Sequence, residues 1–279
     1  MNPATGKLFI QEVAPRDGFQ NEAQFIDTDD KIRFIDALSE CGFAKIEVTS
    51  FTSAKAIPAL RDAEAVMQQI NRRPGVVYTV LVPNLRGAER ALSCRVDEVN
   101  LVMSASETHN RANLRMSREQ SFAQLRDIIN TLRGSGVAIN VSLSTVFGCP
   151  MEGDVSVDEV MRLVDGFAQL DVRSMTLCDT TGMAYPTQVN EIAAQARQRF
   201  ASIDFTLHFH NTRGMALANT MAALDAGIRR FDASAGGIGG CPYAPGASGN
   251  VCTEELVHML NLMGYDTGVD LQRLLAVSA

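Results

Sequence analysis

Residues 172–210 read VRSMTLCDTTGMAYPTQVNEIAAQARQRFASIDFTLHFH, and they hold the pattern that decides the fold. An apolar segment, VRSMTLC (172–178), is followed by an amphipathic stretch and then by a second apolar segment, DFTLHFH (204–210). Short apolar runs separated by a helical pattern are typical of parallel β-α-β units. This part of the chain therefore predicts two parallel strands that are connected by a helix.

The same alternation runs through the rest of the chain. Six further apolar segments are LFIQEVA (8–14), KIEV (45–48), GVVYTVLV (75–82), VDEVNLVM (96–103), VAINVSLS (137–144) and IRRFDAS (228–234). Between the segments, Ser117 with Gln120 and Ser156 with Glu159 are placed as capping boxes that start helices. Eight alternations at roughly thirty-residue spacing predict an α/β fold, a (β/α)₈ TIM barrel. Residues 250–279 are expected to form a C-terminal helical extension, a helix plus a tail.

A doubly wound sheet is the alternative architecture. It normally carries a glycine-rich dinucleotide fingerprint after the first strand, whereas this chain reads APRDGFQNE over residues 14–22. No linker, low-complexity tract or charge run marks a domain boundary. We therefore expect residues 1–279 to form a single TIM-barrel domain.

The composition is that of an ordinary globular protein, with 46% hydrophobic and 20% charged residues among 279. A net charge of −7 argues against a nucleic-acid partner, because such binding relies on clustered Lys and Arg. The six cysteines form no C-x-x-C pair and are expected to be reduced thiols. The first residues resemble neither a signal peptide nor a transit peptide, and no long apolar run is present. These features predict a cytoplasmic protein without a membrane partner.

In a TIM barrel the active site lies at the carboxyl ends of the strands, so polar residues after each apolar segment are the candidates. His208 and His210 are two positions apart near the end of the seventh segment, and the strand period of two points both imidazoles into the barrel. Asp17 follows the first segment, which is separated from the seventh only by the eighth. Together the three predict a mononuclear metal site with N and O donors. A core histidine and ordinary Arg-Asp-Gly turn chemistry are the alternatives.

Residues 235–249 follow the eighth segment and hold six glycines, a composition that suits a loop closing over a bound substrate. Cys241 lies in this loop and is either a reactive group or an inert small residue. Asn250 ends the loop, where its side chain is either a fourth metal ligand or a cap for the next helix.

Several segments together resemble the 3-hydroxy-3-methylglutaryl-CoA lyase family, within a wider group of barrel metalloenzymes. The resemblance rests on EVAPRDGFQNE (12–22), IEVTSFTSAKAIPAL (46–60), HNRANL (109–114), FGCPMEGDV (147–155), LCDTTGMAYP (177–186), HFHNTRGMALAN (208–219) and GGCPYAPGASGN (239–250). The last segment is specific to the lyases, whereas Arg-Asp-Gly and His-x-His are shared with condensing relatives.

The resemblance implies a divalent cation held by Asp17, His208, His210 and Asn250. Since the donors are N and O atoms and the site keeps open positions, Mg²⁺ or Mn²⁺ is expected rather than a closed zinc site. The implied partner is an acyl-CoA substrate, which a retro-Claisen cleavage converts to acetyl-CoA and an oxo acid, acetoacetate for hydroxymethylglutaryl-CoA. A homo-oligomer, a dimer, is also expected.

The resemblance further implies catalytic roles for Arg16, Glu47 and Cys241, in addition to Asp17, which is counted among the catalytic residues as well as the metal ligands. Arg16 stabilises the enolate, Cys241 is an acid/base on the loop, and Glu47 belongs to the hydrogen-bond network around the metal.

The family usually shows His-x-His-Asp-Thr-Tyr-Gly-Gln, whereas this chain has Asn211, Arg213 and Met215 in place of the Asp, Tyr and Gln. These differences leave the ligands intact and open the question of the acyl group. Alternatives are a lyase for another branched 3-hydroxyacyl-CoA, a condensing synthase, an aldolase, or a non-catalytic acyl-CoA-binding barrel.

Overall fold

The computed structural model describes residues 6–240 and 249–279, and its centre is a closed barrel of eight parallel strands in chain order. The strands are β1 (Phe9–Glu12), β2 (Lys45–Ser50), β3 (Val77–Leu81), β4 (Glu98–Ser104), β5 (Ala138–Ser144), β6 (Ser174–Asp179), β7 (Asp204–Phe209) and β8 (Arg230–Ala233). Each strand overlaps one of the eight predicted segments. The barrel closes where β8 pairs with β1, with Glu12 opposite Ala233. The TIM barrel prediction is therefore confirmed.

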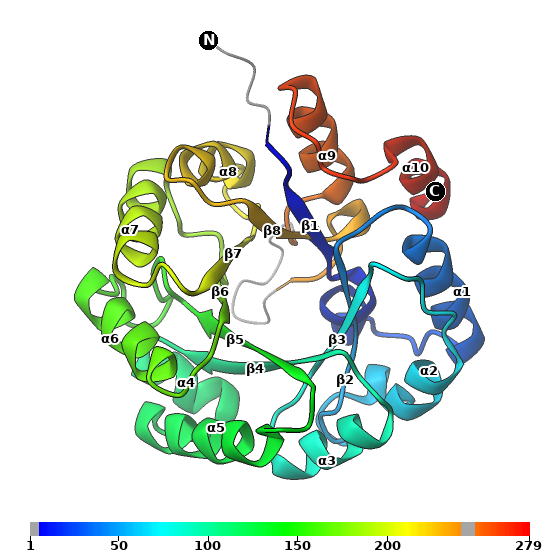
Figure 1. Ribbon diagram of the computed structural model, residues 1–279, viewed down its shortest axis with the longest axis horizontal. Coiled ribbons are helices and arrows are strands. Elements are labelled where there is room, and N and C mark those ends of the chain that lie inside the picture. Colours follow the sequence, from blue (N-terminus) through cyan, green and yellow to red (C-terminus); the bar gives the residue numbers. More distant parts are fainter. Residues whose placement is uncertain (1–5, 241–248) are drawn as a thin grey trace.

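Helices surround the barrel on the outside (Figure 1). They are α1 (Thr28–Ser39), α2 (Ala63–Gln69), α3 (Leu85–Ser93), α4 (Glu107–Leu114), α5 (Arg118–Leu132), α6 (Val157–Ala168), α7 (Pro186–Arg199), α8 (Ala216–Asp225), α9 (Thr253–Leu262) and α10 (Leu271–Ser278). Four short turns follow strands or loops: η1 (Ala14–Gly18), η2 (Phe19–Asn21), η3 (Pro58–Leu60) and η4 (Ala235–Gly237). Of these, η1 follows the carboxyl end of β1 after one residue, and η4 follows the carboxyl end of β8 in the same way.

One of the two predicted capping boxes is complete. Ser117 accepts a hydrogen bond from the Gln120 amide, and the Gln120 side chain accepts one from the Ser117 amide. At Ser156 only the first half forms, because the Glu159 carboxylate is bound by Arg118 and Arg162 instead. The second box was thus half right: a pair of guanidinium groups draws the Glu159 side chain away from the helix start.

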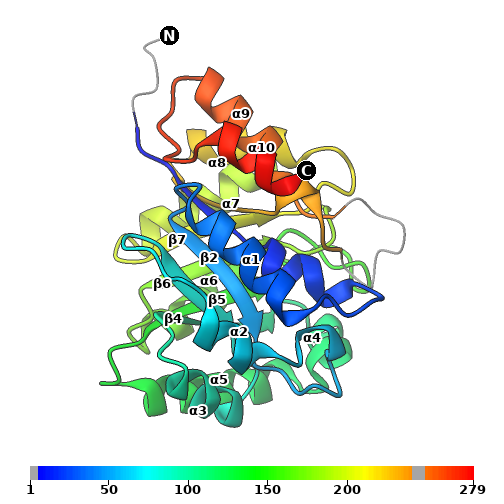
Figure 2. The ribbon, with the colours of Figure 1, turned by 90° about the vertical axis from the view of Figure 1, so that its right-hand side faces the viewer.

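The C-terminal extension differs in detail from the prediction of one helix and a tail. Residues 250–279 form two helices, of which α9 takes the place in the outer ring between α8 and α1 (Figure 1). The residues expected to form a tail are the helix α10, which packs against α9 and α1. Leu274 is buried, and Asp270 caps the helix at the Arg273 amide. Figure 2 shows α9 and α10 side by side beyond α1.

The apolar core lies between the strands and the helices, whereas the interior of the barrel is polar. Outward side chains such as Ile46, Val99 and Leu207 are fully buried under the helices. Inside, Gln11 donates to Thr206 at 2.9 Å from strands on either side of β8. Alternation along each strand separates the two sets.

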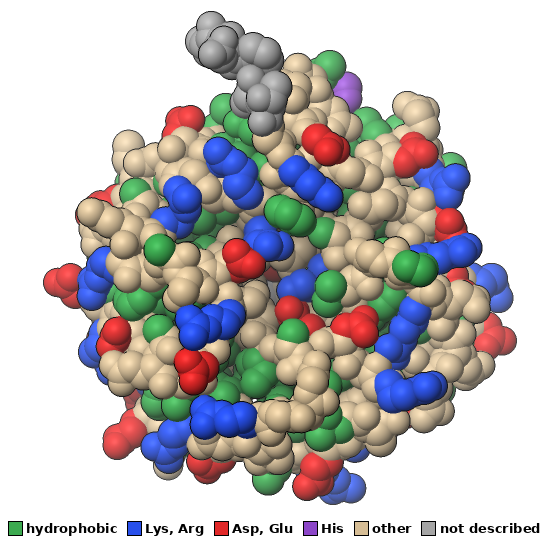
Figure 3. Space-filling view, viewed as in Figure 1, with side chains coloured by type: hydrophobic (Ala, Val, Ile, Leu, Met, Phe, Trp, Pro, Cys, Tyr) green, Lys and Arg blue, Asp and Glu red, His purple; other side chains and the backbone are tan. Residues whose placement is uncertain are grey.

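One face of the molecule carries mixed charge. On the face seen in Figure 3, Lys and Arg side chains are interspersed with Asp and Glu rather than gathered in one patch. Among the described residues, no helix is both long and apolar enough to cross a membrane.

Candidate active site

Three of the predicted ligands meet at the carboxyl end of the barrel. Asp17 lies on η1, His208 in β7, and His210 one residue beyond β7. One ligand atom from each lies within 4.8 Å of the other two. All three side chains are buried. The topology brings the groups together as the sequence predicted, with a geometry that a metal ion can bridge.

Asn250 joins this cluster. It pairs with His210 in an isolated antiparallel bridge, and its Nδ2 donates to Asp17 Oδ2 at 2.8 Å and to the Ile238 carbonyl at 3.1 Å. Its Oδ1 is buried and has no hydrogen-bond partner among the described residues. The helix-capping interpretation is wrong, because α9 begins after Cys252 and has no side-chain cap. The Asn250 side chain instead turns toward Asp17.

Sequence reasoning missed Asp232, which lies on β8 directly opposite His208 in the strand register. Asp232 Oδ2 is 3.2 Å from His208 Nδ1. A carboxylate that binds one imidazole nitrogen fixes the ring and leaves the other nitrogen, Nε2, for a metal. The register of the parallel strands would have found it, because this register places Asp232, an inward residue of the eighth segment, beside His208.

The pKa values of the two histidines are shifted in opposite directions. Burial lowers the pKa of His208, but the hydrogen bond and the charge of Asp232 outweigh burial and raise it. Burial and the neighbouring His208 lower the pKa of His210 to about 4. His210 is therefore a neutral imidazole near pH 7, the form that binds metals.

Arg16 is held between two carboxylates. Its Nε and Nη2 reach Glu47 Oε2 at 2.7 and 2.5 Å, and its Nη1 pairs with Asp17 Oδ1. Burial lowers the pKa of Arg16, but the two carboxylates raise it above its ordinary value. Burial raises the pKa of Asp17, but Arg16 and the two histidines bring it down to about 2. Arg16 is thus a fixed cation beside an ionised Asp17.

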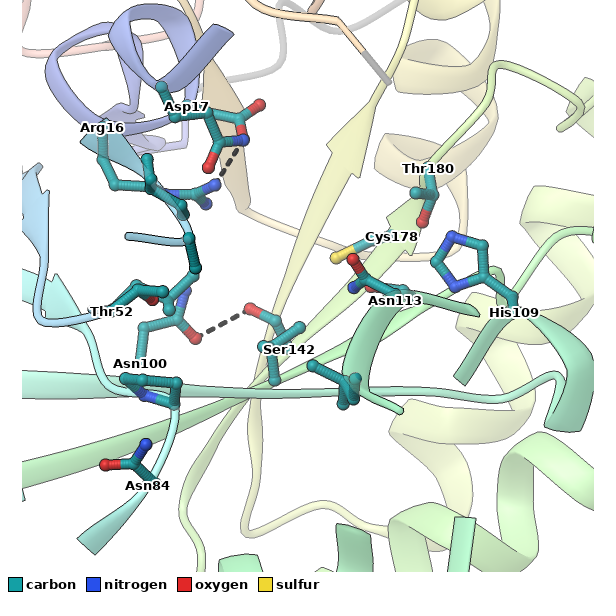
Figure 4. A pocket seen from close by; sticks show the side chains of 18 of the residues that line it. Arg16, Asp17, Thr52, Asn84, Asn100, His109, Asn113, Ser142, Cys178 and Thr180 are labelled. Atoms are coloured by element: carbon teal, nitrogen blue, oxygen red, sulfur yellow. Dashed lines mark hydrogen bonds and ion pairs between the residues drawn. The ribbon is translucent and has the colours of Figure 1, made fainter. Parts of the chain in front are cut away.

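A cavity of about 860 Å³ opens at this end of the barrel. Arg16, Asp17, His208 and His210 line one side of it, and Figure 4 shows His109 from α4 among the side chains on another. This volume is within the range of small-molecule sites.

The three residues that depart from the family pattern are not among the described residues that line the cavity. Arg213 Nη1 donates to the Thr181 and Gly182 carbonyls at 3.0 and 2.8 Å, and Asn211 Oδ1 accepts from the Ala216 amide at 3.2 Å. Met215 immediately precedes α8. Arg213 and Asn211 thus bind the backbone of neighbouring loops.

Two glycines of the segment 235–249 let its backbone approach the cluster closely. A Cβ on Gly239, whose φ is +97°, would lie 2.7 Å from Asn250 Nδ2 and 2.8 Å from the Asp17 carbonyl oxygen. A Cβ on Gly249 would collide with the Gly239 carbonyl oxygen. The base of the segment therefore packs directly on the candidate ligands. Cys241, the predicted acid/base, lies outside the described residues.

Fold and site define a (β/α)₈ barrel with a candidate metal centre of one aspartate, two histidines and one asparagine at the carboxyl ends of its strands. The HMGL-like family model matches residues 7–279. The chain belongs to this family.

Relatives of known name cover nearly the whole chain. The hydroxymethylglutaryl-CoA lyase YngG of Bacillus subtilis is 48% identical over 276 residues, which are 99% of this chain and 92% of the relative. The human mitochondrial hydroxymethylglutaryl-CoA lyase is 40% identical over 269 residues, which are 96% of this chain and 83% of the relative. A solved HMG-CoA lyase from Acinetobacter baumannii, in complex with coenzyme A and 3-methylmalate, is 49% identical with a TM-score of 0.94, covering 100% of this chain and 91% of that one.

Proposed function

We propose that this chain is a carbon–carbon lyase that cleaves 3-hydroxy-3-methylglutaryl-CoA to acetyl-CoA and acetoacetate with the help of a divalent cation. The observation that carries the proposal is the buried cluster of Asp17, His208, His210 and Asn250 beside a cavity of about 860 Å³. Full-length similarity to hydroxymethylglutaryl-CoA lyases supports this substrate. The departures at positions 211, 213 and 215 do not oppose it, since those side chains are not among the described cavity-lining residues.

The donors fit a divalent cation. Asp17 offers a carboxylate, His208 and His210 offer imidazole nitrogens, and the buried Oδ1 of Asn250 lacks a hydrogen-bond partner among the described residues. Such a mixed set with oxygen donors suits Mg²⁺ or Mn²⁺. The cation would supply Lewis-acid polarisation of the substrate's oxygens.

The reaction passes the proton of the substrate's tertiary hydroxyl to the acid/base group, which we assign to Cys241 as a thiolate, and breaks the bond between C2 and C3. The electrons of that bond pass to the thioester as an enolate, and C3 becomes the ketone of acetoacetate. Arg16 is the cation for the enolate oxygen, an electrostatic role of the oxyanion-hole type. Two carboxylates fix its guanidinium before the charge develops. Glu47 thus acts on the reaction by holding Arg16.

Protonation of the enolate carbon completes acetyl-CoA. We assign this step to Cys241 on the basis of the family resemblance and its place in the glycine-rich segment 235–249. Gly239, the second-last described residue before Cys241 in the chain, packs against Asp17 and Asn250.

The coenzyme A moiety needs cations for its phosphates. Lys55 and Arg115 are exposed side chains that line the cavity, and no ion pair of either is found in the described ranges. They are the proposed contacts of the acyl-CoA partner.

We also propose that residues 1–279 form one domain, because the barrel strands span residues 9–233 and the family match extends to residue 279.

We further propose that the protein is cytoplasmic and forms a homodimer. Leu262 on α9 and Leu275 on α10 are exposed large apolar side chains that suit a contact between subunits. Light scattering coupled to size exclusion tests the dimer.

The test incubates metal-stripped protein, with Mg²⁺ or Mn²⁺ restored, with hydroxymethylglutaryl-CoA and a panel of branched 3-hydroxyacyl-CoA thioesters. Release of acetyl-CoA is the readout. We expect hydroxymethylglutaryl-CoA to have the highest kcat/KM and activity to vanish with EDTA. Arg16→Gln is the matched control for the role of the metal. In this variant we expect kcat to collapse while the metal content stays unchanged. Cleavage of free hydroxy-oxo acids at equal rate would favour the aldolase, and absence of any turnover would favour the non-catalytic barrel.

A further inference from the structure

The barrel interior below the candidate ligands is filled by a polar network rather than by the branched apolar residues common in TIM barrels. Asn100 lies on β4, Asn140 and Ser142 lie on β5, and Thr176 lies on β6, and all four are buried. Figure 4 shows Asn100 and Ser142 joined by a hydrogen bond at the floor of the cavity. Buried polar groups cost free energy unless each is hydrogen-bonded, so this network calls for a reason.

Only one orientation of the Asn100 side-chain amide fits its hydrogen-bond partners. Asn100 Nδ2 is 2.9 Å from Glu47 Oε1, and an ionised carboxylate only accepts hydrogen bonds, so the amide nitrogen must face Glu47. Asn100 Oδ1 then accepts from Ser142 Oγ at 2.8 Å and from Asn140 Nδ2 at 2.9 Å. Asn140 is oriented in turn by its donation to Asn100 Oδ1, which leaves its own Oδ1 to accept from Ser174 Oγ at 2.8 Å. A flip of the Asn100 amide would set its oxygen against the Glu47 carboxylate and its nitrogen against Asn140 Nδ2, and would lose both hydrogen bonds.

Glu47 is thereby fixed at both oxygens. Its Oε1 accepts from Asn100, and its Oε2 accepts from Nε and Nη2 of Arg16. Burial raises the pKa of Glu47, whereas Arg16 and the Asn100 hydrogen bond oppose that shift. Asn100 therefore holds the carboxylate in the rotamer that faces Arg16.

We infer that Asn100 is a positioning residue that acts through Glu47 on Arg16, the proposed enolate-stabilising cation. This inference rests on the proposed function for the role of Arg16. Asn100 lies on β4 and is hydrogen-bonded to β5. The orientation of the Arg16 guanidinium therefore depends, through Glu47, on the barrel strands as well as on η1.

The test uses two variants of the metal-loaded enzyme. Asn100→Leu removes the amide but keeps the branched shape, and Asn100→Asp keeps the shape but sets an acceptor against Glu47. We expect kcat to fall roughly 10- to 100-fold in both, the usual effect of losing a partner that orients an active-site group. KM and metal content should stay within about twofold of wild type. The hydrogen bonds of Asn100 go to Glu47, Asn140 and Ser142, and not to the candidate metal ligands or to Arg16. A rise in KM at unchanged kcat overturns the inference and makes Asn100 a substrate contact.

A double-mutant cycle with Glu47→Gln separates positioning from general damage to the barrel. If Asn100 acts through Glu47, adding Asn100→Leu to Glu47→Gln should lower kcat by less than about threefold more. Multiplicative losses overturn the inference. Thr206→Val is the matched control, because it breaks another interior polar pair, with Gln11, that has no bond to Glu47. Its kcat should stay near wild type.

A measurement without turnover keeps this inference distinguishable from the proposed function. The Nε–H resonance of Arg16, assigned by its loss in Arg16→Gln, should be protected from solvent exchange in wild type by the bond to Glu47. In Asn100→Leu we expect its exchange to quicken, whatever the substrate is. Unchanged exchange in Asn100→Leu refutes the positioning role. Quickened exchange in Asn100→Leu, together with a wild type that lacks lyase activity, refutes the proposed function alone.

Discussion

Replacement of the buried Glu12 by glutamine should stabilise the protein at pH 8 and have little effect at pH 5. Glu12 is the last residue of β1 and is fully buried. Its Oε1 accepts from the Ala14 and Ala235 amides, both at 2.9 Å, and its Oε2 accepts from the Thr253 hydroxyl at 2.8 Å. A glutamine can keep this arrangement, with its carbonyl oxygen accepting from the amides and its amide nitrogen donating to Thr253.

The magnitude follows from the pKa of Glu12. Burial raises this pKa from 4.5 to about 7, against the three hydrogen bonds that lower it. The folded state therefore holds a proton that the unfolded chain has released, and the stability from this proton is present below about pH 4.5 and is lost as pH rises through 7. One pKa unit corresponds to about 1.4 kcal/mol. Between pH 5 and pH 8 the loss is on the order of 2 to 3 kcal/mol.

The assay is urea unfolding of wild type and Glu12→Gln at equal protein concentration at both pH values. Other titrating groups are the same in the two proteins, so the change with pH in their difference of unfolding free energy isolates Glu12. We expect Glu12→Gln to gain stability relative to wild type on going from pH 5 to pH 8. A difference that does not depend on pH would refute the reasoning, since it would mean that Glu12 is already ionised at pH 5.

Four other predictions concern the site. His208→Ala should abolish stoichiometric metal binding without loss of the circular dichroism spectrum, and retained metal would exclude this residue as a ligand. Asp232→Asn should weaken metal binding roughly 10- to 100-fold in a chelator competition, because the imidazole loses its orienting carboxylate; unchanged affinity would contradict that role. Lys55→Ala and Arg115→Ala should raise KM for the CoA thioester but leave KM for a thioester without phosphates unchanged, and equal effects on both would argue against phosphate contacts. Cys241→Ala should lower kcat by about 10²- to 10⁴-fold at wild-type Tm, and retention of more than about a tenth of kcat would pass the acid/base role to another group.

The strands and the three main ligands could be predicted because their signals are local. Apolar runs define the strands, and the barrel topology then places Asp17, His208 and His210 at one end without knowledge of any contact. The prediction for 250–279 was weaker, because α10 is short and depends on burial of Leu274, a tertiary contact.

The interior network lay beyond a reading of one sequence. Asn100 and Asn140 stand within segments that were recognised by their apolar content, and the sequence does not show which residue on another strand a polar side chain there will contact. Only the register of β4 with β5, which sets Asn100 opposite Asn140, pairs them. Asp232 was missed for the same reason, since its partner His208 lies on another strand.

The hydrogen bond between Asn250 and Asp17 joins residues 233 positions apart across the junction of β8 and β1. A newly made chain has Asp17 long before Asn250, so the complete donor set exists only after the last strand has docked. A cation bound there would stabilise the closed barrel, by mass action, relative to forms in which β8 and β1 have separated. A break between β4 and β5 would leave Asp17 on one half-barrel and the other three donors on the second, so added cation would favour reassembly of the halves.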